Sequence, residues 1–290
     1  MASHILENEQ ISVEVLTDWG YDRSRYDWGG TVKQVTKDGH TFISREIKCD
    51  GSTGLGGVGL TNVFEWNDTA VYDEAAIADK FPLLGVGLCA KGDTLPFQFT
   101  REYSVTPFER IITTEENSVS IHTLPHMVFG TAVDMIKAYT LEGGSLKVSF
   151  FIKNVGSRDI SAHEFCHNFF MFDKHPVDSS YRVSFPYDIS VKMRRGQVIL
   201  ERDAYRIGAF DGPTDSSAFW LHGWEGIQSH WMKIENSETG TSVLVEDDFP
   251  VSGFYVWNNP RACCPEVYAP IELKSGECVS YTRKYTFNIL

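Results

Sequence analysis

The chain has 290 residues, of which 42% are hydrophobic and 22% are charged, and its formal net charge is -13. This composition is typical of a globular protein, and no apolar run approaches the roughly 20 residues that a membrane helix needs. The negative charge would repel nucleic acid phosphates and anionic membrane surfaces, so we expect no nucleic acid or membrane partner and a neutral or small one instead. A charged sugar stays open as an alternative, because basic residues such as Lys91, Arg101, Arg194 and Arg195 can reverse the field inside one pocket.

The amino terminus has neither the basic start nor the apolar core of a signal peptide, which predicts a cytoplasmic protein. The cysteines are scattered without framework spacing and form no C-x-x-C motif, so reduced thiols are expected and a metal cluster is not. They are Cys49, Cys89, Cys166, Cys263, Cys264 and Cys278.

Short runs rich in β-branched and aromatic residues recur along the chain and are bounded by Gly, Asn, Asp or Ser, a pattern typical of strands and hairpins. They cover residues 11–18, 30–39, 40–51, 118–124, 145–157, 160–173, 183–193, 229–240, 241–248, 252–258 and 278–287. Helix is scarce, with one short candidate at residues 72–79 and a turn near residues 215–219. We therefore predict an all-β fold, an antiparallel β-sandwich in one domain over residues 1–290.

Residues 51–59 (GSTGLGGVG) are rich in glycine and invite comparison with a phosphate-binding loop. The segment lacks the closing G-K-[ST] of that loop. A β-connection is the preferred interpretation.

His163, Glu164 and His167 spell H-E-x-x-H, the zinc protease signature. That motif needs a helix, on which residues four apart share a face. The surrounding β-formers predict a strand, on which the two histidines would be about 13 Å apart and could not share one metal. No metal site is expected here. Strand alternation should place His163, Phe165 and His167 on one face, which would bind. The residues between them, beginning with Glu164, should lie on the other face, which would pack.

The segment from Asn154 and Gly156 to the H-N-F sequence at residues 167–169 resembles the central hairpin of the aldose 1-epimerase (galactose mutarotase-like) superfamily. An early G-G-x-hydrophobic segment at residues 29–35 is also similar to that family's opening strand. The closing pattern is a glutamate followed by P-x-x-L-x-x-G-E, which here reads Glu266, Pro270, Leu273, Gly276 and Glu277. The resemblance implies a β-sandwich of the galactose mutarotase-like type, with a sugar site in the concave face of the larger sheet.

The resemblance also implies the chemistry. In that superfamily the hairpin histidine donates a proton to the ring oxygen of the sugar, and a glutamate before the closing segment is the base; here these are His167 and Glu266. A core histidine is the alternative for His167, and an exposed loop residue is the alternative for Glu266. Acid and base must face one pyranose, so their functional atoms should lie about 5 to 8 Å apart. Both should open onto one cavity that contains aromatic and cationic or amide groups.

Further substrate contacts are expected from Lys91, Arg101, His126, Asn168 and Trp257. Aromatic rings such as Trp257 suit the apolar faces of pyranoses, although they would serve equally well as core. The family's L-H-G-G motif is missing, and residues 85–88 read GVGL in its place. That departure leaves the sugar undefined.

These patterns predict an isomerase of the aldose 1-epimerase (mutarotase) type, which acts on a small-molecule sugar in carbohydrate metabolism and needs no cofactor. Two alternatives stay open on the same fold. One is a carbohydrate lyase or glycoside-cleaving enzyme, and the other is a non-catalytic carbohydrate-binding protein.

Overall fold

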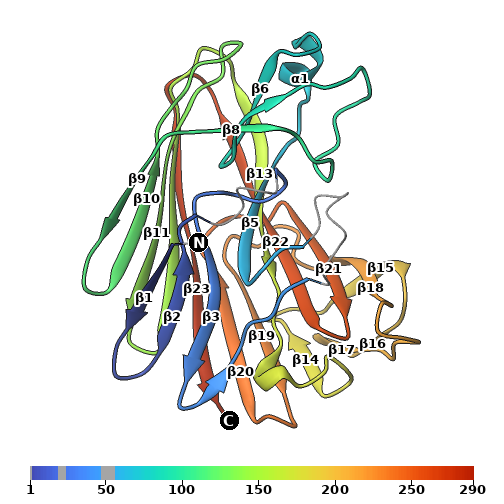
Figure 1. Cartoon of the computed structure of the whole chain (residues 1–290). Helices are drawn as coiled ribbons and strands as arrows, with labels where there is room; N and C mark the ends of the chain where they lie inside the picture. The colour runs from blue at the N-terminus through green and yellow to red at the C-terminus, as the bar shows by residue number, and fades with distance from the viewer. Residues whose placement is uncertain (1, 19–23, 47–55) are drawn as a thin grey trace.

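The protein is a sandwich of two antiparallel ten-stranded sheets, seen in a computed structural model that describes residues 2–18, 24–46 and 56–290 (Figure 1). The first sheet runs in the order β1 (Ser3–Glu7), β2 (Ser12–Leu16), β3 (Thr31–Lys37), β5 (Leu60–Trp66), β13 (Ile160–Asn168), β22 (Ala262–Leu273), β21 (Gly253–Asn259), β18 (Ser217–His222) and β15 (Ser190–Arg195), with β4 (His40–Thr41) beside β3. The predicted all-β sandwich is confirmed.

The second sheet runs in the order β16 (Val198–Leu200), β17 (Ala204–Ile207), β14 (Tyr181–Ser184), β19 (His230–Asn236), β20 (Thr241–Asp247), β23 (Cys278–Ile289), β12 (Ser145–Asn154), β11 (Val133–Glu142), β10 (Ser118–Thr123) and β9 (Arg110–Thr114). Both sheets have ten strands, so neither is the larger one that the sequence led us to expect.

A small third sheet of β6 (Lys80–Leu83), β7 (Gly87–Ala90) and β8 (Val105–Pro107) lies with α1 (Ala70–Glu74) at one end of the sandwich (Figure 1). The helix is shorter than predicted and begins two residues earlier, and a 3-10 turn occurs at Phe172–Lys174. Neither α1 nor another described helix has the length and apolar character to cross a bilayer.

Part of the glycine-rich segment, residues 51–55, lies outside the described residues, as does Cys49. The described end of the glycine-rich segment leads into β5, not into a helix. Gly59 has a φ of +73°, and a Cβ there would lie 1.7 Å from the carbonyl oxygen of Val32. Only glycine allows the backbone to approach β3 this closely.

The core lies between the two sheets and takes alternate side chains from each strand. Arg283 of β23 ties the sheets together within it, since its Nε donates to Asp247 Oδ1 at 2.6 Å and its Nη2 donates to the Val267 carbonyl of β22 at 2.9 Å. Its Nη1 also lies 3.5 Å from Glu164 Oε1 on β13. The strand that carries His167 is therefore held from behind by a buried charge network.

Candidate active site

The face of the first sheet that points away from the second sheet carries a cavity of about 660 Å³. His163, Phe165 and His167 of β13 line it, whereas Glu164 and Cys166 are buried on the opposite face. The predicted alternation along this strand is confirmed, with one face that lines the cavity and one that packs in the core.

Cross-strand register brings the two predicted catalytic residues together. Phe165 of β13 pairs with Tyr268 of β22, and the two strands are antiparallel. His167, two residues after Phe165, therefore lies beside Glu266, two residues before Tyr268. His167 Nδ1 is 2.7 Å from Glu266 Oε1, and the side chains are 7% and 3% exposed. A residue from each of two adjacent strands thus forms one pair on the floor of the cavity.

This contact is shorter than the spacing of 5 to 8 Å that the sequence led us to expect. A sugar ring cannot lie between two atoms that are hydrogen bonded at 2.7 Å. A substrate would have to lie over the pair and reach its outer atoms, His167 Nε2 and Glu266 Oε2. The expected shared cavity with aromatic and cationic lining is present.

The tautomer of His167 follows from its second neighbour. Arg25 Nη2 is 3.0 Å from His167 Nε2, and a guanidinium can only donate. We therefore assign an accepting lone pair to Nε2 and the ring proton to Nδ1, which donates to Glu266. His167 must take up a proton at Nε2 before it can donate one from that atom.

Arg25 is held in place by rings and a carboxylate. Its guanidinium carbon is 5.3 Å from the ring centres of Tyr26 and Phe99. The Glu46 carboxylate accepts from Tyr26 and from the amides of Gly56 and Gly57. Burial acts to raise the pKa of Glu46, but the nearby Arg25 charge and these hydrogen bonds outweigh it and lower that pKa. Arg25 Nε is buried and has no hydrogen-bond partner among the described residues.

Cys264 completes the floor of the cavity. Its thiol donates to Glu266 Oε1 at 3.3 Å, and its sulfur lies 3.8 Å from His167 Nδ1. Burial, with the adjacent Glu266 charge, raises the pKa of this thiol well above its usual value. Cys264 is therefore a neutral hydrogen-bond donor to the carboxylate.

His167, Cys264 and Glu266 offer three ligand atoms within 4.8 Å of one another, a donor set that zinc accepts. A metal would have to displace both the thiol proton and the His167–Glu266 hydrogen bond. The two histidines of the H-E-x-x-H motif, His163 and His167, do not belong to this donor set together. Both lie on strand β13, and His163 contacts Asn67 and Glu65 instead.

We expect EDTA treatment to leave activity unchanged and elemental analysis to find no stoichiometric zinc, because the three donor atoms already satisfy one another. The Cys264→Ala variant serves as the control. One zinc per chain that is lost with activity, and is also lost in Cys264→Ala, would contradict this prediction and assign these three donors as a metal site.

Six of the fifteen residues that line the cavity are phenylalanine, tyrosine or tryptophan: Phe99, Phe165, Trp220, Tyr255, Trp257 and Tyr268. Tyr268 stacks on both Phe165 and His163, at centroid distances of 4.5 and 4.9 Å. The predicted Trp257 does line the cavity. Flat apolar walls beside a few charged groups are typical of small-ligand sites.

Two other predicted contacts lie elsewhere. Lys91 Nζ donates to the Tyr72 carbonyl at 2.8 Å and lies 4.4 Å from the centre of the Tyr72 ring, within the cluster around the small third sheet. Arg101 Nη1 contacts Asp93 at 3.1 Å and its Nη2 donates to the Pro96 carbonyl. Both cations are engaged locally and neither lines the cavity, although Thr100 beside Arg101 does.

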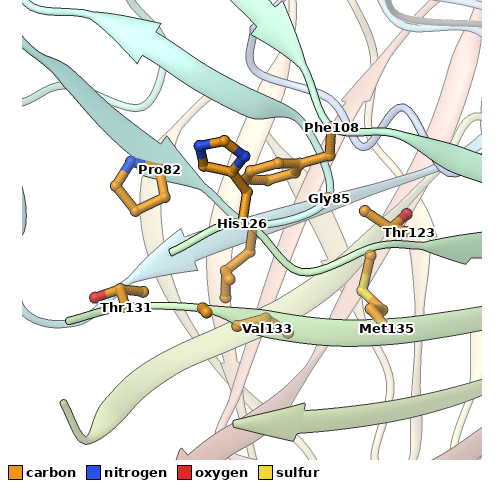
Figure 2. A pocket seen from close by; sticks show the side chains of 10 residues that line it. Pro82, Gly85, Phe108, Thr123, His126, Thr131, Val133 and Met135 are labelled. Carbon is orange, nitrogen blue, oxygen red and sulfur yellow. The ribbon is translucent and has the colours of Figure 1, made fainter. Parts of the chain in front are cut away.

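His126 and Asn168 are also placed away from the cavity. His126 lines a separate pocket of about 20 Å³, near Pro82 and Phe108 (Figure 2), which has room for about one water molecule. Asn168 lies on the packing face of β13, where it donates to the Pro265 carbonyl and accepts from Tyr285. Strand alternation explains the position of Asn168: it directly follows His167, so its side chain points to the opposite face of the sheet.

Sequence reasoning did not place several residues of the site: Arg25, Glu46, Glu65, Phe99, Trp220 and Tyr268. Trp220 and Tyr268 could have been found by alternation if β18 and β22 had been predicted as strands. Arg25 and Phe99 stand on irregular segments with no periodic signal. Glu46 lies in the run predicted as a strand over residues 40–51, of which only His40–Thr41 forms a strand within the described residues.

No family model matches the chain, and a search of curated proteins found no significant match. Solved structures do match. The Slr1438 protein of Synechocystis has 13% identity and a TM-score of 0.62, covering 100% of this chain and 96% of its own. A galactose mutarotase-like protein of Lactobacillus casei has 14% identity and a TM-score of 0.59, covering 99% and 100%.

The chain has the galactose mutarotase-like fold. A galactose 1-epimerase of Lactobacillus acidophilus is also similar, with 10% identity, a TM-score of 0.50 and coverage of 99% of this chain and 94% of its own. Identities this low establish the architecture alone. In this galactose mutarotase-like fold, the site lies on the exposed face of the first sheet and the core lies on the other.

Proposed function

We propose that the protein is an aldose 1-epimerase-like isomerase that interconverts the anomers of a free sugar or sugar derivative. The observation that supports this most directly is the His167–Glu266 pair on the floor of a cavity of about 660 Å³. A cavity of that volume suits a small ligand. The chemistry described below requires no cofactor.

The proposed reaction needs a proton acceptor and a proton donor. Ring opening removes the proton from the anomeric hydroxyl and adds a proton to the ring oxygen, and ring closure reverses the two transfers. Within the described residues, the Glu266 carboxylate contacts His167 and Cys264 through Oε1. Its other oxygen, Oε2, is therefore available to accept the hydroxyl proton. His167 Nε2, once protonated, would serve the ring oxygen.

The surrounding groups suit a sugar. Trp257, Tyr255 and Trp220 offer flat apolar surfaces to the CH faces of a pyranose. Arg25 offers a charged donor next to Nε2, and a sugar oxygen could replace that nitrogen as its acceptor. The non-catalytic binding alternative would use the same aromatic walls, so only turnover separates the two.

We expect the protein to shorten the time in which a freshly dissolved, anomerically pure sugar reaches equilibrium. One-dimensional proton NMR follows the two anomeric signals directly, over a panel of neutral, deoxy and acidic sugars. Binding of a panel sugar without faster equilibration would contradict the isomerase proposal and favour a binding protein. New unsaturated or shortened products from oligosaccharides would instead favour the lyase or glycoside-cleaving alternative.

A further inference from the structure

Two consecutive arginines, Arg194 and Arg195, both line the cavity. Consecutive residues of a regular strand point to opposite faces. Here β15 pairs with β18 through Met193 and Phe219, and then through Arg195 and Ala218, so that Arg194 is an extra residue. This β-bulge lets both arginines face the same side of the sheet.

The register of the sheet places Arg195 across the cavity from β22, in the row next to that of Glu266 on the same face. Arg195 lies in one cross-strand row with Ala218, Trp257 and Cys264. Three strand spacings of about 4.8 Å separate β15 from β22, which gives about 14 Å between the backbones. The two arginines and Glu266 line the same cavity from these two strands.

The charges of the cavity separate into paired and unpaired groups. Glu266 contacts His167, Glu65 contacts His163, and Glu46 accepts from Tyr26. Arg194 and Arg195, in contrast, form no ion pair or side-chain hydrogen bond with any residue in the described part of the chain.

Both arginines are exposed and stand on β15, the edge strand of the first sheet. The charge of Arg195 helps to lower the pKa of the Asp215 carboxyl, after the hydrogen bonds from the Asp211 and Ser216 amides, but the two residues form no ion pair. An anion that binds both guanidinium groups would reduce the repulsion between their like charges. The guanidinium fork matches carboxylate and phosphate geometry, so the missing partner is expected to be an oxyanion.

We infer that Arg194 and Arg195 form a subsite for an anionic substituent of the substrate, so that the sugar is a carboxylate or phosphate derivative. This inference rests on the proposed sugar site, but not on catalysis in it. The anion would lie at the β15 wall while the anomeric carbon lies over His167 and Glu266. The bulge has the role of presenting two donors to one group.

The test is calorimetric binding of three probes: glucose, glucuronate and glucose 6-phosphate. We expect one of the two anionic sugars to bind about 10- to 100-fold more tightly than glucose, as expected for hydrogen bonds to a charged group. The preference should disappear in Arg194→Ala/Arg195→Ala. The sugar that shows the larger preference identifies carboxylate or phosphate as the group.

Arg202→Ala is the matched control, because Arg202 is an 83% exposed arginine that contacts only Asp188. It should leave the preference unchanged. Equal binding of glucose and both anions, no binding of either anion, or a preference that survives in the double variant would overturn the subsite.

These outcomes are independent of the isomerase proposal. Selective binding without faster anomer exchange would leave the subsite standing and remove the activity. If the protein speeds up the exchange of glucose anomers equally well in the double variant and shows no preference for the anions, the activity would stand and the subsite would be removed.

Discussion

Replacement of His167 by alanine or glutamine is expected to lower the rate of anomer interconversion by about 10² to 10⁴, the usual contribution of a positioned acid or base. The imidazole is the only group on β13 that contacts both Glu266 and Arg25. Its Nε2 lies where a proton can be exchanged with a bound sugar. The NMR assay of anomer equilibration measures this loss directly.

Glu266→Gln should give a loss of similar size, since it removes the proton acceptor and keeps the shape. The double variant should lose little more than either single variant, because residues that act as one unit are not additive. His222→Gln provides the control, since His222 is an exposed histidine of the same sheet that contacts Glu225 and does not line the cavity. A folded His167→Gln protein with unchanged turnover would refute the mechanism.

Arg283→Met is expected to lower the free energy of unfolding by about 3 to 5 kcal/mol, the usual cost of removing one partner of a buried ion pair. Arg283 is 2% exposed and contacts Asp247 and Glu164, whose side chains are fully buried. Without the guanidinium, the buried Asp247 keeps the His230 ring, whose Nδ1 is 3.3 Å from its Oδ2, but loses the shorter contact of 2.6 Å to Arg283. Urea unfolding at neutral pH gives the difference.

The pH dependence of that difference has a defined sign. Burial acts to raise the pKa of Asp247, but the charges of Arg283 and His230 and the hydrogen bonds from both residues together outweigh it, and the pKa is lowered. A lowered folded-state pKa stabilises the protein above the unfolded value near 4, and that contribution is lost as pH falls through the folded value. In Arg283→Met the carboxyl can protonate more readily, so the gap to the wild type should narrow in acid.

The exposed Arg202–Asp188 pair again supplies the comparison. Arg202→Ala should change the free energy of unfolding by less than about 1 kcal/mol, as is usual for a surface ion pair. An Arg283→Met protein as stable as this control would show that the buried network does not hold the sheets together.

The strand that carries His167 could be predicted because its alternation is strong and its neighbours are aromatic. Strand β22 was harder to predict, since Cys263, Cys264, Pro265 and Pro270 weaken the strand signal within Ala262–Leu273. Strand β11 reads VDMIKAYTLE, in which Met, Lys, Ala, Leu and Glu favour helix. Because β22 was not predicted, the direct contact between His167 and Glu266 could not be inferred from register.

The sequence offered four basic residues for a pocket, Lys91, Arg101, Arg194 and Arg195, but local pattern could not show which of them line it. Lys91 donates to the Tyr72 carbonyl of α1, and Arg101 pairs with Asp93 in the loop after β7. Arg194 faces the cavity through a bulge, which depends on pairing between strands far apart in the chain. Such pairing is a property of the assembled sheet.

The separation of the two faces of the first sheet has a consequence for how this protein can change. Thr61, His167, Glu266, Tyr255, Trp220 and Lys192 form one row across six strands. Most members of this row can be exchanged without opening a void between the sheets, because their side chains point away from the core. A one-residue deletion within β22 would instead exchange the two faces of that strand. Point substitutions in this row can therefore change the shape and charge of the cavity while the core stays intact. A shift of register in β22 would disrupt the cavity and the core together.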